Sequence, residues 1–335
     1  MTWLRSCALA LAFVCASTAF SQDTSCLRRT VPLGIVTVPG APITQIASSD
    51  LRAEFRGKPA QILALSGHVH PRRVLILLDA SGSMQGPTGA LWSASVYVAD
   101  QFAQSNLAST SLGLFIFGKR AGEQIPFSQG NAAVQRRLRD ILADPKYAKE
   151  HVYGMTPLRD AILEGVKMFG TPGAGDAILV VSDGGENASR SKESALPVDL
   201  LANGIRLFSC IIRAHEGGPT SEERGDTGDL RELAATTGGL AVEPFRGQTS
   251  GDVAQFFAGH SSPVQAALLT LDKQITDYGL VEFVLPSSVT KRERWTLSLT
   301  KEKSRELKGA KLLYPQELLP CKATGSHETV STQHP

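Results

Sequence analysis

The sequence predicts an α/β fold with a doubly wound (Rossmann-like), mostly parallel sheet, flanked by a small antiparallel β unit. Three observations support this prediction. Residues 74–78 are all apolar, and a short apolar run without alternation is typical of a strand buried on both faces. Strand and helix signals then alternate as far as residue 243, the pattern of a parallel sheet with helices on both faces. Shorter, alternating runs lie at both ends of the chain, outside this region.

Each element of the α/β region has its own local signal. In the first expected helix, Leu91, Val98 and Phe102 recur with helical spacing on one face. The fourth expected helix stops at Gly204, because glycine commonly ends helices. Helices are predicted at residues 90–105, 131–142, 157–169, 194–203 and 229–237. Strands are predicted at residues 74–78, 111–118, 177–181, 205–212 and 240–243.

The segments on either side of this region have a different pattern. Residues 34–38 (G-I-V-T-V) and 281–285 (V-E-F-V-L) are examples of short runs, broken by Pro, Gly and Ser, that are typical of antiparallel strands. Because such runs flank the α/β region at both ends, the simplest arrangement pairs them into one β unit. The expected division is a signal peptide at 1–21, an N-terminal β segment at 22–70, an α/β domain at 71–260, a C-terminal β segment at 261–320 and a loose tail at 321–335.

The composition is that of an ordinary globular protein. The chain has 335 residues, of which 42% are hydrophobic and 20% are charged. Its 34 basic and 32 acidic residues leave a net charge of +2. Proteins that depend on contacts with phosphate backbones carry a larger positive excess, so we expect no nucleic-acid partner.

The first 21 residues have the layout of a secretory signal peptide. Arg5 supplies a positive charge, residues 7–20 are almost wholly apolar, and Ala19 and Ser21 are the small residues expected before a cleavage point at Gln22. An uncleaved membrane anchor is the alternative, but the apolar run is shorter than the roughly 20 residues that a spanning helix needs. We therefore expect a secreted or periplasmic protein with no transmembrane segment after cleavage.

Three cysteines remain once the signal peptide is removed. Cys26 and Cys321 could form a disulfide in an oxidising compartment, and the sequence leaves this pairing open. Cys210 lies within the apolar run 207–212 and is expected to be a buried, unreactive strand residue. The seven histidines are scattered, and neither they nor the cysteines have the spacing of a zinc site.

Five oxygen-bearing residues follow strands or precede a helix. Asp79, Ser81 and Ser83 form a D-x-S-x-S loop after the first strand, Thr156 precedes a helix, and Asp183 follows another strand. In parallel sheets the carboxyl ends of the strands meet at one edge, where ligands bind. Hydroxyl and carboxylate oxygens suit Mg²⁺, Mn²⁺ or Ca²⁺ better than zinc or copper. The set is too small to fill an ion's coordination shell, so an outside ligand could complete it.

Simpler explanations exist for each of these loops. The D-x-S-x-S segment could be an Asx or Ser turn, and Asp183 could belong only to a tight turn. Three such turns at one sheet edge favour a metal site instead. Because Pro157 suits the first helical position, Thr156 is expected to be the helix N-cap, with exposed amides beside the site. Glu186 is expected to be a solvated loop residue rather than a sixth ligand.

The same loops resemble the metal-ion-dependent adhesion site (MIDAS) of von Willebrand factor type A domains. The resemblance covers residues 71–260 and is carried by D-A-S-G-S-M at 79–84, G-M-T-P-L at 154–158 and V-S-D-G-G-E-N at 181–187. It implies that the hydroxyls of Ser81, Ser83 and Thr156 contact a divalent ion, with Asp79 and Asp183 bound directly or through water. It also implies that a Glu or Asp of a protein partner completes the shell.

The flanks of the domain carry a second resemblance. Residues 55–62 (F-R-G-K-P-A-Q-I) and 308–314 (K-G-A-K-L-L-Y) are similar to segments of secreted bacterial proteins related to this domain. This likeness implies no defined activity.

Two classes of function follow from these observations. The first is a secreted or envelope-associated binding module, without enzymatic activity, that uses its cation to bind an acidic residue of a partner in adhesion, assembly or scaffolding. The alternative is a metal-dependent hydrolase, because a half-filled shell could activate water. No His, Cys or Lys belongs to the three loops, so they show no evident general base or nucleophile pair, and binding without catalysis is favoured.

Overall fold

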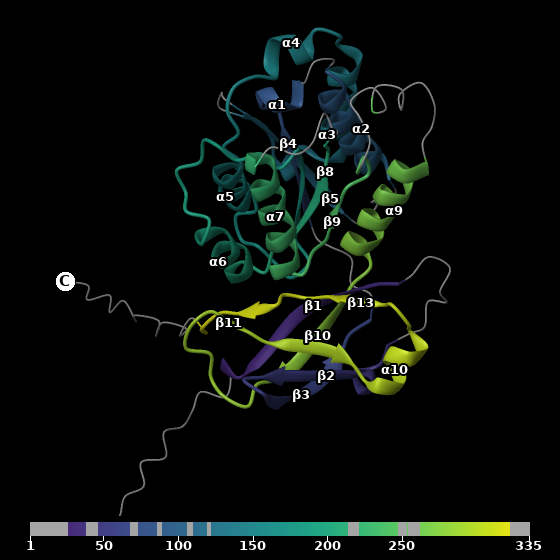
Figure 1. Ribbon diagram of the computed structural model, residues 1–335, viewed down its shortest axis with the longest axis vertical. Coiled ribbons are helices and arrows are strands. Elements are labelled where there is room, and N and C mark those ends of the chain that lie inside the picture. Colours follow the sequence, from purple (N-terminus) through teal and green to yellow (C-terminus); the bar gives the residue numbers. More distant parts are fainter. Residues whose placement is uncertain are drawn as a thin grey trace, which may run out of the picture.

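A six-stranded sheet forms the centre of the α/β domain, with strand order β6-β5-β4-β7-β8-β9 (Figure 1). All neighbouring strands are parallel except the edge pair β5 and β6. The computed structural model describes residues 26–37, 46–67, 73–85, 89–105, 110–118, 122–213, 221–246, 253 and 262–321. The predicted signal peptide, His68, His70 and residues 322–335 of the predicted tail lie outside these residues.

The strands of this sheet confirm the five predicted ones and add a sixth. They are β4 (Arg73–Asp79), β5 (Ser111–Phe117), β6 (Glu123–Ile125), β7 (Ala177–Ser182), β8 (Arg206–Ile211) and β9 (Ala241–Val242). The sequence did not predict β6, because a three-residue edge strand is too short to show alternation.

Helices cover both faces of the sheet. They are α1 (Gly82–Gln85), α2 (Ala90–Gln104), α3 (Asn131–Ala143), α4 (Tyr147–His151), α5 (Leu158–Met168), α6 (Ala195–Ala202), α7 (Ser221–Thr236) and α9 (Ser262–Thr276). Helices α2, α3 and α9 contribute to one buried cluster, and α5, α6 and α7 contribute to the other. The sequence predicted only the second half of α7, and it predicted neither α1, α4 nor α9.

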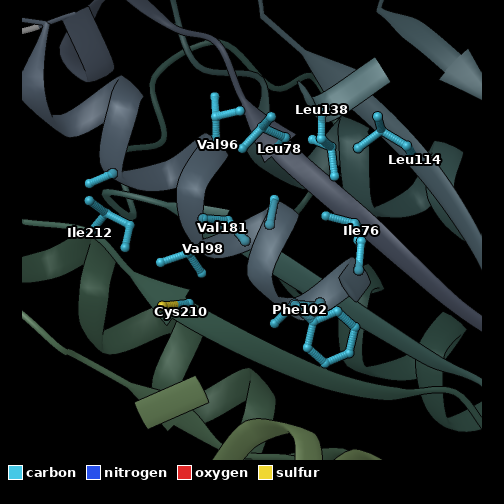
Figure 2. Packing of buried hydrophobic residues seen from close by; sticks show 14 of the residues in the cluster. Ile76, Leu78, Val96, Val98, Phe102, Leu114, Leu138, Val181, Cys210 and Ile212 are labelled. Carbon is cyan, nitrogen blue, oxygen red and sulfur yellow. The ribbon is translucent and has the colours of Figure 1, made fainter. Parts of the chain in front are cut away.

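The two faces of β4 explain why its sequence does not alternate. Val74, Ile76 and Leu78 belong to the cluster on the α2 side, whereas Leu75 and Leu77 belong to the cluster on the α5 side. Figure 2 shows Ile76 and Leu78 among the apolar side chains of the first cluster. Every residue from 74 to 79 is buried, so both faces must be apolar until the strand reaches its carboxyl end.

A second sheet of six strands lies beside the α/β domain, with strand order β12-β2-β3-β10-β1-β13 (Figure 1). These strands are β1 (Arg28–Val36), β2 (Leu51–Phe55), β3 (Lys58–Leu65), β10 (Gly279–Val284), β12 (Thr296–Leu299) and β13 (Lys311–Leu313). Smaller elements complete the chain: β11 (Glu293–Arg294), β14 (Glu317–Leu318), α10 (Lys301–Glu306), and the 3₁₀ turns η2 (Ser48–Asp50) and η3 (Phe127–Gln129).

Strands from the two ends of the chain pair with one another within this second sheet. Strand β1 pairs antiparallel with β10 and β13, and β2 pairs antiparallel with β3 and β12. The predicted antiparallel β unit built from both ends is therefore confirmed. Cys26 and Cys321 form a disulfide, with their Cα atoms 5.5 Å apart. The sequence left this pairing open, and the structure shows that it forms.

Helix α9 lies where the sequence predicts strands. Residues 261–320 were expected to form a β segment, but Val264, Leu271 and Ile275 of α9 pack in the core of the α/β domain. The helix leads directly into β10, which lies in the second sheet. The strand-like alternation of the segment that follows hides the helical spacing of its apolar residues.

Buried polar contacts join the two parts of the molecule. The guanidinium of Arg206, at the start of β8, donates to the carbonyl oxygens of Gln274 (3.0 Å) and Ile275 (2.9 Å) at the end of α9. The side-chain amide of Gln274 in turn donates to the carbonyl of Ile35 in β1, at 3.0 Å. Burial lowers the pKa of Arg206 to about 10. No helix in the described parts of the chain has the length and apolar character needed to cross a membrane.

Candidate metal centre

The first polar loop begins at the carboxyl end of β4. Asp79, the last residue of this strand, is fully buried. Its Oδ1 accepts a hydrogen bond from the backbone N–H of Ser81 at 2.9 Å, and its Oδ2 accepts one from the hydroxyl of Ser182 at 2.6 Å. The hydroxyl oxygens of Ser81 and Ser83 lie 3.1 Å apart. Two hydroxyl oxygens that could bind an ion therefore lie close together, directly after a buried carboxylate.

The second loop, residues 152–157, packs on the first. The N–H of Gly82 donates to the carbonyl of Gly154 at 2.9 Å, and the N–H of Tyr153 donates to the carbonyl of Ala80 at 3.1 Å. A Cβ atom at position 82 would lie 3.1 Å from the carbonyl oxygen of Gly154. Glycine at position 82 thus permits this close approach, which ties the first loop to the loop that carries the buried Thr156.

The third loop, residues 182–187, follows β7 and holds Asp183. The N–H of Gly185 donates to Oδ1 of Asp183 at 2.9 Å. A Cβ atom at position 185 would lie 3.3 Å from Oδ1 of Asp183 and 3.7 Å from Oγ1 of Thr156. The carboxylate of Asp183 and the hydroxyl of Thr156 therefore border the same small space.

The electrostatics of these loops are unfavourable for two carboxylates alone. Burial, with the nearby negative charge of Asp183 as the second cause, raises the pKa of Asp79 to about 7. Hydrogen bonds from Ser182 and Ser81 offset part of this rise. No Lys, Arg or His belongs to the three loops. A cation bound among these oxygens would supply the missing positive charge.

The residues present fit a hard divalent cation. Two carboxylates and three hydroxyls are oxygen ligands of low total charge, which suits Mg²⁺, Mn²⁺ or Ca²⁺. Within the described residues, no three or more His, Cys, Asp and Glu side chains form a cluster that could hold a metal. The structure brings the predicted residues to one edge of the sheet, and their binding of an ion stays a prediction. They are Asp79, Ser81, Ser83, Thr156 and Asp183.

The expected role of Thr156 as a helix N-cap is wrong. The cap position of α5 is Pro157, and no side-chain hydrogen bond caps the helix there. The first amides of α5 are not exposed either, because the N–H of Arg159 donates to Glu186 at 2.8 Å and that of Asp160 donates to the hydroxyl of Ser189 at 3.1 Å. The third loop therefore satisfies the helix amides.

The expectation that Glu186 is solvated is wrong, because only 7% of its side chain is exposed. Its carboxylate is turned to backbone amides. It accepts hydrogen bonds from the N–H groups of Ala188 and Ser189, in addition to that of Arg159. A carboxylate at a helix N-terminus also interacts favourably with the helix dipole.

Sequence reasoning missed two residues that support the predicted ligands. Ser182 contacts Asp79, and Asn187 contacts Thr156 through a 2.7 Å hydrogen bond from the Thr156 N–H to its Oδ1. Both residues lie within the V-S-D-G-G-E-N segment that was singled out. Their partners lie far away in sequence, so no local pattern indicated the contacts.

The fold and the position of these loops define an α/β domain that presents polar side chains at the carboxyl ends of parallel strands. Residues 74–186 match the family model described as the von Willebrand factor type A domain. The chain therefore contains a von Willebrand factor type A (vWA) domain, and the match extends from the first strand of this domain to Glu186 in the third loop.

Several solved structures are similar to the chain. An aerotolerance-related membrane protein from Bacteroides fragilis is 17% identical, with a TM-score of 0.42, over 61% of this chain and 98% of that one. The protein BatB from Bacteroides thetaiotaomicron is 18% identical, with a TM-score of 0.35, over 59% of this chain and 99% of that one. The pilus adhesin SpaC from Lactobacillus rhamnosus GG is 10% identical, with a TM-score of 0.41, over 84% of this chain and 48% of that one. No curated protein sequence matches the chain.

Proposed function

We propose that the chain is a secreted or envelope-associated binding module that uses a divalent cation to bind a carboxylate of a protein partner. A vWA domain is a protein-interaction module, and the cation and the carboxylate are the finer parts of this proposal. The observation that carries it is the pair of hydroxyl oxygens of Ser81 and Ser83, 3.1 Å apart, directly after the buried carboxylate of Asp79.

The proposed ligands have different roles. Ser81, Ser83 and Thr156 would hold Mg²⁺, or Mn²⁺ or Ca²⁺, through their hydroxyls. Asp79 and Asp183 supply the negative charge, and both oxygens of Asp79 already accept hydrogen bonds from the protein. Because both oxygens are engaged in this way, we expect Asp79 to interact with the ion through a bridging water or through its negative charge. The bound ion would supply an electrophilic position for a carboxylate from outside, because five side chains of low charge leave its shell incomplete.

We also propose that the module does not catalyse a reaction. The three loops contain no His, Cys or Lys, so they offer no imidazole, thiol or amine as a general base or nucleophile. The carboxylates of Asp79 and Asp183 are engaged by hydrogen bonds from Ser81, Ser182 and Gly185. Metal-dependent hydrolysis of a generic ester or phosphate substrate, lost in Asp79→Ala, would contradict this part of the proposal.

Export through the predicted signal peptide is part of the same proposal. The disulfide between Cys26 and Cys321 supports it, because disulfides persist in oxidising compartments outside the cytosol. For the domain division we propose that the vWA domain extends beyond residue 260 to include α9, whose apolar side chains belong to its core. The β unit then consists of the N-terminal and C-terminal segments on either side of this extended vWA domain.

A cation-dependent pull-down tests the proposed function. The purified protein is used to capture envelope and secreted proteins of its source organism with Mg²⁺ and with excess chelator. Ser83→Ala serves as the ligand variant and Ser93→Ala, in α2, as the matched serine control. We expect a partner that is retained only with Mg²⁺, by the wild type and by the control. A partner that binds all three proteins equally in chelator would place recognition elsewhere.

A further inference from the structure

Asn187 links two of the three polar loops, although it is not one of the predicted ligands. Its Oδ1 accepts a hydrogen bond from the N–H of Thr156 at 2.7 Å, and its own N–H donates to the carbonyl of Thr156 at 3.2 Å. We propose that Asn187 is a positioning residue of the metal site, which fixes Thr156 against the loop that carries Asp183. This inference rests on the proposed function, because it concerns the same ion.

The position of Thr156 in the chain explains why it needs such a residue. It precedes Pro157, and the first backbone hydrogen bond of α5 runs from the N–H of Ala161 to the carbonyl of Pro157 at 2.9 Å. Thr156 therefore lies outside the helix, and it belongs to no strand. A buried residue whose backbone has no partner in regular structure must find its hydrogen bonds elsewhere. Asn187 provides both of them.

Fixing the backbone of Thr156 also fixes where its hydroxyl can lie. With N–H and C=O both held, the remaining freedom is rotation about the Cα–Cβ bond, and threonine has few favourable rotamers. Its Oγ1 then borders the space beside Gly185 that Oδ1 of Asp183 also borders. The relative position of these two predicted ligands, which belong to different loops, therefore depends on Asn187.

Further hydrogen bonds hold the third loop and the residues after it against α5. Glu186 accepts from the N–H of Arg159 in α5, while Asp160 of α5 accepts from the N–H groups of Arg190 and Ser191, each at 3.0 Å. Each segment thus contributes one acidic side chain that accepts from amides of the other. Because this exchange remains when Asn187 is changed, we expect the loop to keep its place and only Thr156 to lose its fixed orientation.

Substitution of Asn187 separates positioning from folding. Its side chain is exposed, so truncation leaves no cavity. Asn187→Ala removes the acceptor for Thr156, whereas Asn187→Asp keeps an acceptor at the same place. Asn203→Ala is the matched control, because the side-chain amide of Asn203 also bonds the backbone near a helix end: it donates to the carbonyl of Asp199 in α6 at 2.7 Å, away from the loops.

The experiment measures Mn²⁺ affinity by electron paramagnetic resonance and the melting temperature in excess chelator for each full-length variant. We expect Asn187→Ala to weaken Mn²⁺ binding by about 10–100-fold, as is typical for residues that orient metal ligands. Asn187→Asp should restore affinity to at least that of the wild type, helped by its charge, and Asn203→Ala should leave it unchanged. In chelator, Asn187→Ala should melt no lower than Asn203→Ala.

The outcomes distinguish this inference from the proposed function. A wild type that binds no Mn²⁺ overturns the proposed function, and the inference with it. A wild type that binds Mn²⁺ with the same affinity as Asn187→Ala overturns the inference alone. Equal losses in Asn187→Ala and Asn187→Asp, or a melting temperature of Asn187→Ala far below that of Asn203→Ala in chelator, show a role in folding and also overturn it.

Discussion

The hydroxyl of Ser182 donates a hydrogen bond to Oδ2 of Asp79 across 2.6 Å, and it joins the carboxyl ends of the neighbouring strands β7 and β4. The same hydroxyl oxygen accepts from the N–H of Gly184 at 3.0 Å. Ser182 is fully buried, as is Asp79. The first and third loops are therefore connected through one side chain that neither the D-x-S-x-S pattern nor the position of Asp183 indicates.

Ser182→Ala is expected to destabilise the protein. It removes the hydrogen bond to Oδ2 of Asp79 and leaves a buried acceptor unsatisfied, which costs about 1–3 kcal/mol. Urea unfolding in chelator measures the change in the free energy of unfolding. Ser93→Ala is the control, because the Ser93 hydroxyl donates to the carbonyl of Gly89, the N-cap of its own helix α2. Equal stability of Ser182→Ala and the wild type would contradict the importance of this contact.

Mg²⁺ is expected to raise the melting temperature of the wild type but not that of Asp79→Asn. An ion at a hundred times its Kd stabilises the native state by about 2.7 kcal/mol. In chelator, Asp79→Asn should melt at the same temperature as the wild type or at a higher one, because the substitution removes a buried negative charge close to Asp183. Calorimetry with Mg²⁺ and with chelator measures both effects. Identical curves for the wild type in the two conditions would contradict a metal site here.

Ser83→Ala is expected to weaken metal and partner binding without loss of stability. Ser83 is exposed, and its backbone, the turn and the charge of Asp79 are all retained. Substitution at such a position changes stability by about 0.5 kcal/mol or less. Titration with Mn²⁺ and chemical unfolding in chelator separate the two quantities. A variant with full Mn²⁺ affinity would remove Ser83 from the proposed ligands.

Reduction of the disulfide is expected to destabilise the β unit and leave the ion's affinity unchanged. The bond joins residues 295 positions apart, and in the chain-entropy model closure of so long a loop contributes up to about 5 kcal/mol. Cys26→Ser combined with Cys321→Ser should lower the free energy of unfolding, as measured by urea unfolding. Mn²⁺ affinity should match the wild type, because the bond lies in the β unit. Free thiols at both positions in exported protein would contradict the pairing.

Arg206→Met is expected to destabilise the packing of the end of α9 against β8. The guanidinium donates to two carbonyls at the end of α9, and hydrogen bonds from charged groups contribute about 1.5–3 kcal/mol each. Arg206→Lys keeps the charge but not the two parallel donors, so it should recover part of the loss. Thermal unfolding of both variants checks the order. A more stable Arg206→Met would show that burial of the charge costs more than its contacts provide.

The candidate site was predicted in its ligand types but not in its supporting contacts. Asp79, Ser81 and Ser83 stand in one short segment directly after an apolar run, so their residue types and strand-end position can be read locally. Glu186 accepts from the nearby amides of Ala188 and Ser189 and from that of Arg159, and only the Arg159 amide is distant in sequence. The contact between Asn187 and Thr156 also joins residues that are distant in sequence, so no local pattern indicates it.

The sequence by itself determined the α/β core and the antiparallel strands around it. The run at 74–78 and the helical spacing of Leu91, Val98 and Phe102 are local consequences of which faces must be buried, and a local pattern can be read without knowing the fold. Only the tertiary structure decided that α9 packs on the vWA core, that Cys26 pairs with Cys321, and that Ser182 holds Asp79. These contacts join residues distant in sequence, and their partners are chosen by the path of the whole chain rather than by the residues next to them.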